Sequence, residues 1–308
     1  MRKKKSKIFI LGFLTLSLIL VMILLNFLGS KKQSIELGGS TREYLLHLSR
    51  SHDSSENLPL VIALHGYTDN PRLMEFYSGL SRKSDREGFV VVYPYGTKND
   101  TDKNLSWNGG SCCGNGVLSN VEDVQFINSL TDELIEKYKI DPERIYIAGF
   151  SNGGLLAHRI ASETPERYKA IAVVSGAIGG KVYKKLPPYI IPNPKKPVSM
   201  LLMHGMKDSR IPYKGGLNNS KDGEFKSFKE SSELWIQNNN CKGSLKTENK
   251  VSINESFENC ENETRVELYS VKESGHMWFG GIGELFKNLK GESISATSII
   301  WSFFKTAK

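Results

Sequence analysis

The stretch IYIAGFSNGGLLAHRIA, residues 145–161, decides the fold class. An apolar, β-branched run meets Gly-Phe-Ser-Asn-Gly, and a helix-like pattern of apolar residues follows at once. A sharp strand-to-helix turn needs glycines two residues before and two residues after Ser151, because larger side chains there would collide with the turn. The pattern predicts a serine hydroxyl raised above a sheet edge. It can also arise by chance in a chain with 28 glycines, so the context decides.

The rest of the chain alternates between the same two kinds of element. Continuous apolar runs that end in a turn are typical of buried parallel strands, and they cover residues 58–66, 89–96, 144–150, 169–176 and 198–205. Residues 44–48 predict an early strand, and the more polar residues 265–275 a last one near an edge. Helical spacing of apolar residues predicts helices over residues 121–138, 154–162, 225–237 and 294–304. This order predicts a single α/β domain, with a mostly parallel central sheet and helices on both faces.

Two further polar residues follow strands of this sheet. Asp208 comes after the strand of residues 198–205, and His276 after the last strand. Histidine can take the proton of a serine at neutral pH, and a buried carboxylate fixes the histidine tautomer. The order Ser, Asp, His is that of the α/β-hydrolases, so we predict a catalytic triad of Ser151, Asp208 and His276. Asp123 is the alternative acid, but it opens a helix, where the helix dipole explains a carboxylate.

An ester hydrolase also needs N–H donors for the oxyanion that develops on the substrate. The backbone N–H of Asn152, at the start of the helix after the serine, is one candidate. The turn in ALHGYTDN, residues 63–70, should supply the other, and we predict Tyr67, with Thr68 as the alternative. Trp107 is a candidate for substrate binding, and core packing explains it equally well.

Several separated motifs together resemble the polyhydroxybutyrate-depolymerase and feruloyl-esterase-like branch of the α/β-hydrolases. They span nearly all of residues 38–304, and WNGGSCCG followed by VEDV is more specific than G-x-S-x-G. The resemblance implies secreted hydrolysis of carboxylic esters by Ser151, Asp208 and His276, with no metal and no organic cofactor. Members usually show Trp-Pro-Gly after the histidine, whereas here Phe279 follows Trp278. Trp278 therefore stays a candidate substrate-binding residue, and the shape of the pocket is left open.

The N-terminal residues 1–33 form a separate segment before the predicted catalytic domain of residues 34–308. Residues 1–32 carry seven basic and no acidic residues, whereas the formal net charge of the chain is +8. The remainder is close to neutral, so a nucleic-acid partner has no electrostatic support. Residues 8–28 contain no charge and are long enough to span a bilayer. We expect an uncleaved membrane anchor; a cleaved signal peptide and a buried soluble helix are the alternatives.

Four cysteines agree with export from the cytoplasm. Cys241 and Cys260 bracket a polar stretch that cannot pack by itself, and we predict a disulfide between them. Cys112 and Cys113 are adjacent, and they either pair with each other or reach elsewhere. The spacing lacks the paired cysteines of a zinc site.

The sequence therefore predicts an extracytoplasmic serine esterase, either anchored in a membrane by residues 8–28 or secreted. The sequence fits several ester substrates: hydroxyalkanoate oligomers, feruloylated or acetylated polysaccharides, and short-chain esters. The expected binding partner is therefore an ester substrate, which is a polymer in some of these cases. The alternatives are a peptidase of the same fold and a catalytically silent hydrolase fold that serves as a surface binding protein.

Overall fold

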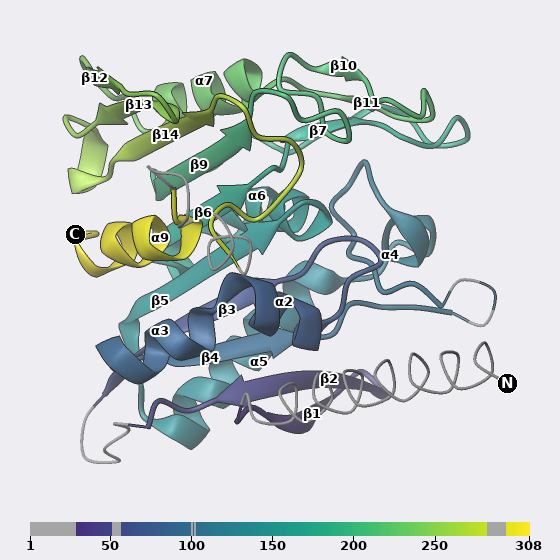
Figure 1. Ribbon diagram of the computed structural model, residues 1–308. Coiled ribbons are helices and arrows are strands. Elements are labelled where there is room, and N and C mark those ends of the chain that lie inside the picture. The colour runs from purple at the N-terminus through teal and green to yellow at the C-terminus, as the bar shows by residue number, and fades with distance from the viewer. Residues whose placement is uncertain (1–28, 51–56, 100, 102, 282–293) are drawn as a thin grey trace, which may run out of the picture.

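One sheet of ten strands organises the computed structural model, which describes residues 29–50, 57–99, 101, 103–281 and 294–308 (Figure 1). The strand order is β1-β2-β4-β3-β5-β6-β9-β14-β13-β12. From β4 to β14 neighbouring strands run parallel, and antiparallel strands extend both edges. The bounds are β1 Lys31–Leu37, β2 Ser40–His47, β3 Leu58–Leu64, β4 Val90–Pro94, β5 Ile140–Phe150, β6 Ala170–Val174, β9 Ser199–Gly205, β12 Leu245–Glu248, β13 Ser252–Phe257 and β14 Val266–Val271.

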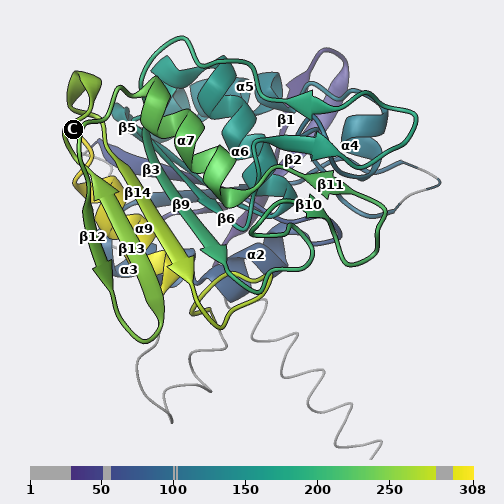
Figure 2. The ribbon, with the colours of Figure 1, turned by 90° about the horizontal axis from the view of Figure 1, so that it is seen from above.

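Helices cover both faces of this sheet (Figures 1 and 2). Apolar residues of the strands alternate between the two faces: Ile62 joins one hydrophobic core, whereas Val61 and Ala63 join the other. Helices α5 (Asp123–Tyr138), α6 (Asn152–Glu163) and α7 (Phe228–Asn238) pack on the first face, and α2 (Pro71–Ser78), α3 (Leu80–Glu87) and α9 (Ala296–Lys305) on the second. The remaining short elements are α4 (Gly114–Leu118), η1 (Pro165–Arg167) and η2 (Glu261–Glu263).

A second, small sheet lies beside the carboxyl ends of β6 and β9 (Figure 1). Its strand order is β10-β11-β7-β8, and the bounds are β7 Gly179–Lys181, β8 Tyr189–Ile190, β10 Gly216–Leu217 and β11 Glu224–Phe225. These strands belong to the segments that follow β6 and β9 along the chain. The small sheet therefore stands at the edge of the main sheet where an active site is expected.

The α/β fold with a mostly parallel sheet is confirmed, and so are the central strands and the four expected helices. The last expected strand, β14, lies between β9 and β13, third from one edge of the sheet, and so nearer that edge than the other parallel strands. Its alternating polar residues reflect partial exposure of one face. Strands β1, β12 and β13 and helices α2 and α3 had no counterpart among the expected elements.

Helix α7 is fixed at both ends by features that the sequence contains. Its first turn is a capping box, in which Ser227 Oγ accepts from the N–H of Glu230 and the Glu230 carboxylate accepts from the N–H of Ser227. Beyond its last turn, Cys241 is joined to Cys260, which confirms the predicted disulfide. Because β12 and β13 lie between these cysteines, the bridge ties the edge of the sheet to the end of α7.

The first described strand begins just before residue 34, where the catalytic domain was predicted to start. Strand β1 begins at Lys31, and the hydroxyl of Ser30 donates to the buried carboxylate of Glu75 on α2. In the part of the chain that the structure describes, no helix has the length and hydrophobicity needed to cross a membrane. The expected anchor, residues 8–28, lies outside the described residues.

Candidate active site

Ser151 stands on the turn between β5 and α6, as its glycine neighbours predict. Its φ of 54° and ψ of −119° are a rare backbone conformation for a residue with a side chain. A Cβ on Gly149 would press against the carbonyl of Gly153, and a Cβ on Gly153 would press against the carbonyl of Leu64 on β3. Glycine is therefore required at both positions, because the neighbouring backbone leaves no room for a side chain. This explains why glycines flank the serine.

The three predicted triad residues meet at this turn. Nδ1 of His276 lies 2.7 Å from Oδ2 of Asp208, and Nε2 of His276 lies 2.8 Å from Oγ of Ser151. A carboxylate only accepts, so Nδ1 carries the proton and Nε2 is free to accept from the serine hydroxyl. This is the arrangement in which a histidine can act as a base toward a serine.

Asp208 is held so that its carboxylate stays ionised. Oδ1 accepts from the backbone N–H of Arg210 at 2.9 Å and from that of Ile211 at 3.0 Å. The residue is 6% exposed. Burial by itself would raise the pKa of Asp208, but hydrogen bonds from His204 and His276 outweigh burial and hold this pKa well below its usual range.

The rival acid, Asp123, has a structural role at a different place. It is fully buried, and it accepts from the Arg42 side chain at 2.8 Å and from the N–H of Asn108 at 2.7 Å. Burial raises the pKa of Asp123, and Arg42 opposes that shift. Asp123 thus joins the loop after β4 to β2, and it makes no contact with His276 among the described residues.

The turn after β3 is built around a buried histidine. His65 donates from Nδ1 to the carbonyl of Gly66 at 2.7 Å and accepts at Nε2 from the N–H of Gly96 at 3.0 Å. Burial lowers the pKa of His65 to about 4, so the ring is neutral. The N–H of Thr68 donates to the carbonyl of Leu105, which disfavours Thr68, the alternative oxyanion donor; Tyr67 stays the predicted donor of this turn.

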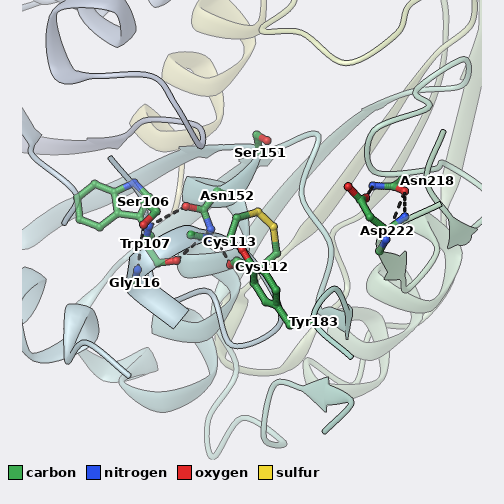
Figure 3. The surroundings of a disulfide bond; sticks show 12 residues. Ser106, Trp107, Cys112, Cys113, Gly116, Ser151, Asn152, Tyr183, Asn218 and Asp222 are labelled. Carbon is green, nitrogen blue, oxygen red and sulfur yellow. Dashed lines mark hydrogen bonds between the residues drawn. A yellow bond between two sulfur atoms is a disulfide. The ribbon is translucent and has the colours of Figure 1, made fainter. Parts of the chain in front are cut away.

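The side chain of Asn152 has a role that the sequence did not indicate. Its Oδ1 accepts from the N–H of Trp107 at 2.7 Å, and its Nδ2 donates to the carbonyls of Trp107 at 3.1 Å and Cys112 at 2.7 Å (Figure 3). Cys112 and Cys113 are disulfide-bonded to each other, and the N–H of Gly114 donates to the hydroxyl of Tyr183. Asn152 therefore fixes the WNGGSCCG loop to the turn that carries Ser151.

Both tryptophan candidates lie in the interior. Trp107 is fully buried, where its Nε1 donates to the carbonyl of His65 at 2.9 Å. Trp278 is 6% exposed, and its Nε1 donates to the hydroxyl of Thr297 on α9. The indole rings thus support the turn after β3 and the segment after His276, and contact of either ring with a substrate stays a prediction.

Known proteins similar to this chain are esterases. Residues 43–189 match the family described as Esterase PHB depolymerase. The chain has the α/β-hydrolase fold and resembles these esterases in sequence. It is 26% identical over 246 residues to feruloyl esterase B of Piromyces equi, an alignment that covers 76% of this chain and 42% of that protein. It is 31% identical over 123 residues to poly(3-hydroxyalkanoate) depolymerase C of Paucimonas lemoignei, covering 39% of this chain and 28% of that protein.

The fold is similar to that of solved esterase structures. The acetyl xylan esterase from Aspergillus awamori matches 84% of this chain and 98% of its own with a TM-score of 0.57, at 15% identity. That likeness confirms the α/β-hydrolase fold, and the sequence resemblance to the depolymerase and feruloyl esterase branch is confirmed as well. The chain spans half or less of the length of the first curated relatives it matches.

Proposed function

We propose that the protein is an extracytoplasmic serine esterase that hydrolyses carboxylic esters through an acyl-enzyme on Ser151. The observation that carries the proposal is the position of His276, whose two ring nitrogens contact Ser151 and the buried carboxylate of Asp208. Relatives named as esterases and depolymerases support the same class of reaction.

In the proposed reaction, Ser151 Oγ attacks the acyl carbonyl while its proton passes to Nε2 of His276. The imidazolium that forms is stabilised by Asp208, and it returns the proton to the departing alcohol. A water molecule then attacks the acyl-serine with His276 as the base, which releases the acid and restores the serine.

The oxyanion of each tetrahedral intermediate would lie at the start of α6. The first N–H groups of a helix have no partner within the helix and carry its positive dipole end, and the N–H of Asn152 belongs to this set. The N–H of Tyr67, across the turn after β3, is the proposed second donor. The clamp by the Asn152 side chain and the buried ring of His65 would hold these donors in place before substrate binds.

A polar groove beside this turn favours a hydroxyl-rich alcohol as the leaving group. The groove has a volume of about 600 Å³ and is lined by Thr68 and Asp69 of the turn, the end of β4 and the start of β2. Threonine, asparagine and lysine side chains surround one tyrosine, Tyr95. Such a lining offers many hydrogen bonds to a sugar and few apolar contacts to a hydroxyalkanoate chain. Acetyl or feruloyl esters of carbohydrates are therefore the proposed substrates.

Hydrolysis by the full chain, purified in mild detergent, tests both levels of this proposal. Two esters of the same acyl group are compared, one with methanol and one with an oligosaccharide. The oligosaccharide ester should have a kcat/KM at least about tenfold higher than that of the methyl ester. Tyr95→Ala should reduce that preference and leave the methyl ester unaffected, whereas Tyr269→Ala, at the other end of the sheet, should change neither. Hydroxybutyrate oligomers as the better substrates would overturn the carbohydrate assignment and keep the esterase.

The two alternatives predict different results. A silent surface binding protein would hydrolyse none of the esters and would not react with a fluorophosphonate probe. A peptidase would cleave amides in preference to the matched esters.

We further propose that residues 8–28 keep the enzyme attached to a membrane with the catalytic domain outside the cytoplasm. The full-length protein should then remain in the membrane fraction after washing with high salt, and external protease should reach the catalytic domain. A shortened chain recovered from the medium would show a cleaved signal instead.

A further inference from the structure

A second histidine lies on the carboxylate of the proposed triad. His204, on β9, is four residues before Asp208, and its Nε2 is 3.3 Å from Oδ2 of Asp208 and 2.8 Å from the carbonyl oxygen of Ile211. A carbonyl oxygen only accepts, so Nε2 of His204 carries a proton and donates it. The side chain is 1% exposed, which excludes water as a substitute for these contacts.

A second buried imidazole, that of His158 on α6, also lies in this interior. Trp235 on α7 donates from Nε1 to Nδ1 of His158 at 3.0 Å, so neutral His158 carries its proton on Nε2. Burial lowers the pKa of His158 to about 3. In the described part of the chain, Nδ1 of His204 is buried without a hydrogen-bond partner, so the contacts that hold this ring are those of Nε2.

The carboxylate of Asp208 is held on both of its oxygens. Nε2–H of His204, anchored by the carbonyl of Ile211, lies 3.3 Å from Oδ2, which is the oxygen that faces His276. Together with the two backbone donors on Oδ1, it leaves the carboxylate no freedom to rotate away from His276.

We propose that His204 is a positioning residue of the triad, whose imidazole holds the Asp208 oxygen on which His276 depends. This inference rests on the proposed function. It assigns His204 no contact with the substrate, so its effect should appear in turnover rather than in substrate binding.

The other titratable and charged groups near this carboxylate have partners of their own. Lys207, next to Asp208 in sequence, pairs with Glu273, and Asp69, on the turn after β3, accepts the hydroxyl of Tyr77. The ring of Tyr213 is 5.9 Å from that of His204, and the Tyr213 hydroxyl pairs with Ser270. Arg210 contributes its backbone N–H. The side chains that contact the Asp208 carboxylate within the described ranges are thus those of His204 and His276.

Two amide variants separate hydrogen bonding from packing. The side-chain N–H of His204→Gln can reach the position of Nε2, whereas that of His204→Asn reaches only the position of Nδ1. His204→Gln should keep kcat within about threefold of wild type. His204→Asn should lose about ten- to a hundred-fold in kcat, the usual effect of one hydrogen bond to a charged group, with KM changed by less than about twofold.

The pH profile gives the readout that a packing role would not change. In His204→Asn, the carboxylate has one donor fewer and holds the imidazolium proton more tightly, so the acid limb of the kcat/KM profile should move to higher pH. His47→Asn is the matched control: His47 is also buried and paired with an acid, Asp85, but on the far side of the fold. It should lower the melting temperature and leave kcat and the acid limb unchanged.

The outcomes distinguish this inference from the function on which it rests. The inference is overturned if His204→Asn has the kcat of wild type and the same acid limb in its pH profile. It is also overturned if the Asn and Gln variants lose kcat equally, because His204 would then act only through packing. Full activity in Ser151→Ala would instead overturn the triad itself. The expected result is an inactive Ser151→Ala protein and a clear separation of His204→Gln from His204→Asn.

Discussion

Replacing Asp208 by asparagine keeps the size of the side chain and exchanges one acceptor for a donor, so it tests the geometry of the acid directly. In the native protein, the backbone N–H groups of Arg210 and Ile211 both donate to Oδ1. These two donors will hold the amide oxygen of the new side chain at that position. The new NH₂ group must then face His276, where Nδ1–H now meets a donor.

The expected loss follows from this forced orientation. His276 can relieve the clash only by moving its proton to Nε2, and in that tautomer it cannot accept a proton from Ser151. A histidine held in the wrong tautomer costs about ten-thousand-fold in kcat, equivalent to about 5 kcal/mol in the transition state. His204 adds to the effect, because its Nε2–H would meet the same NH₂ group.

The assay is steady-state hydrolysis of one activated ester, with circular dichroism to verify folding of each variant. Asp123→Asn is the matched control, since Asp123 is equally buried and hydrogen-bonded but lies away from His276. It should keep kcat within about threefold while losing roughly 3 kcal/mol of stability, because Arg42 is left without its partner. The reasoning is wrong if Asp208→Asn keeps more than a tenth of wild-type kcat, or if Asp123→Asn is the inactive variant.

Three further predictions concern backbone packing, the disulfide and pH. Gly153→Ala should abolish soluble expression or probe reactivity, since its Cβ has no room beside the carbonyl of Leu64; normal labelling would contradict the tight turn. Reduction of the Cys241–Cys260 bridge should lower the free energy of unfolding by about 3 kcal/mol, as measured with a Cys241→Ser/Cys260→Ser variant in urea; an unchanged midpoint would refute this. The pKa of Glu230 is lowered to about 2 by the side chain of Lys226 and the capping box; its stabilisation should be complete above its ordinary pKa of 4.5 and disappear as pH falls toward 2. Glu230→Gln should therefore weaken the pH dependence of the melting temperature in that window, and an identical dependence in both proteins would exclude the carboxylate.

The central sheet could be predicted because buried parallel strands are apolar on both faces. The runs that form β3, β4, β6 and β9 are buried along their whole length, so hydrophobicity alone reveals them. The edge strands carry no such signal. All four residues of β12 are exposed, and its position depends on pairing with β13 rather than on its own composition.

The triad could be predicted because a nucleophile on a strand-to-helix turn has a local sequence signature, and because its partners follow strands. The supporting residues have no local signature. Asn152 was expected to act through its backbone, but its side chain also binds a loop 40 to 45 residues earlier in the chain. His204 was one of several histidines without an evident pattern. It lies four residues before Asp208 along the chain, and the pairing of β14 with β9 brings His276 to the same carboxylate. Trp107 suited both a cleft and a core, and the ring is buried in the structure.

The most direct test of the central claim is the site of covalent labelling by a fluorophosphonate, read by mass spectrometry of peptides from the full-length protein. The reagent requires a serine that is activated by a neighbouring base. The account predicts one adduct, on the peptide that contains Ser151, and no adduct in His276→Ala or Ser151→Ala. Labelling of another residue, or ester hydrolysis that persists after Ser151 has been removed, would contradict it.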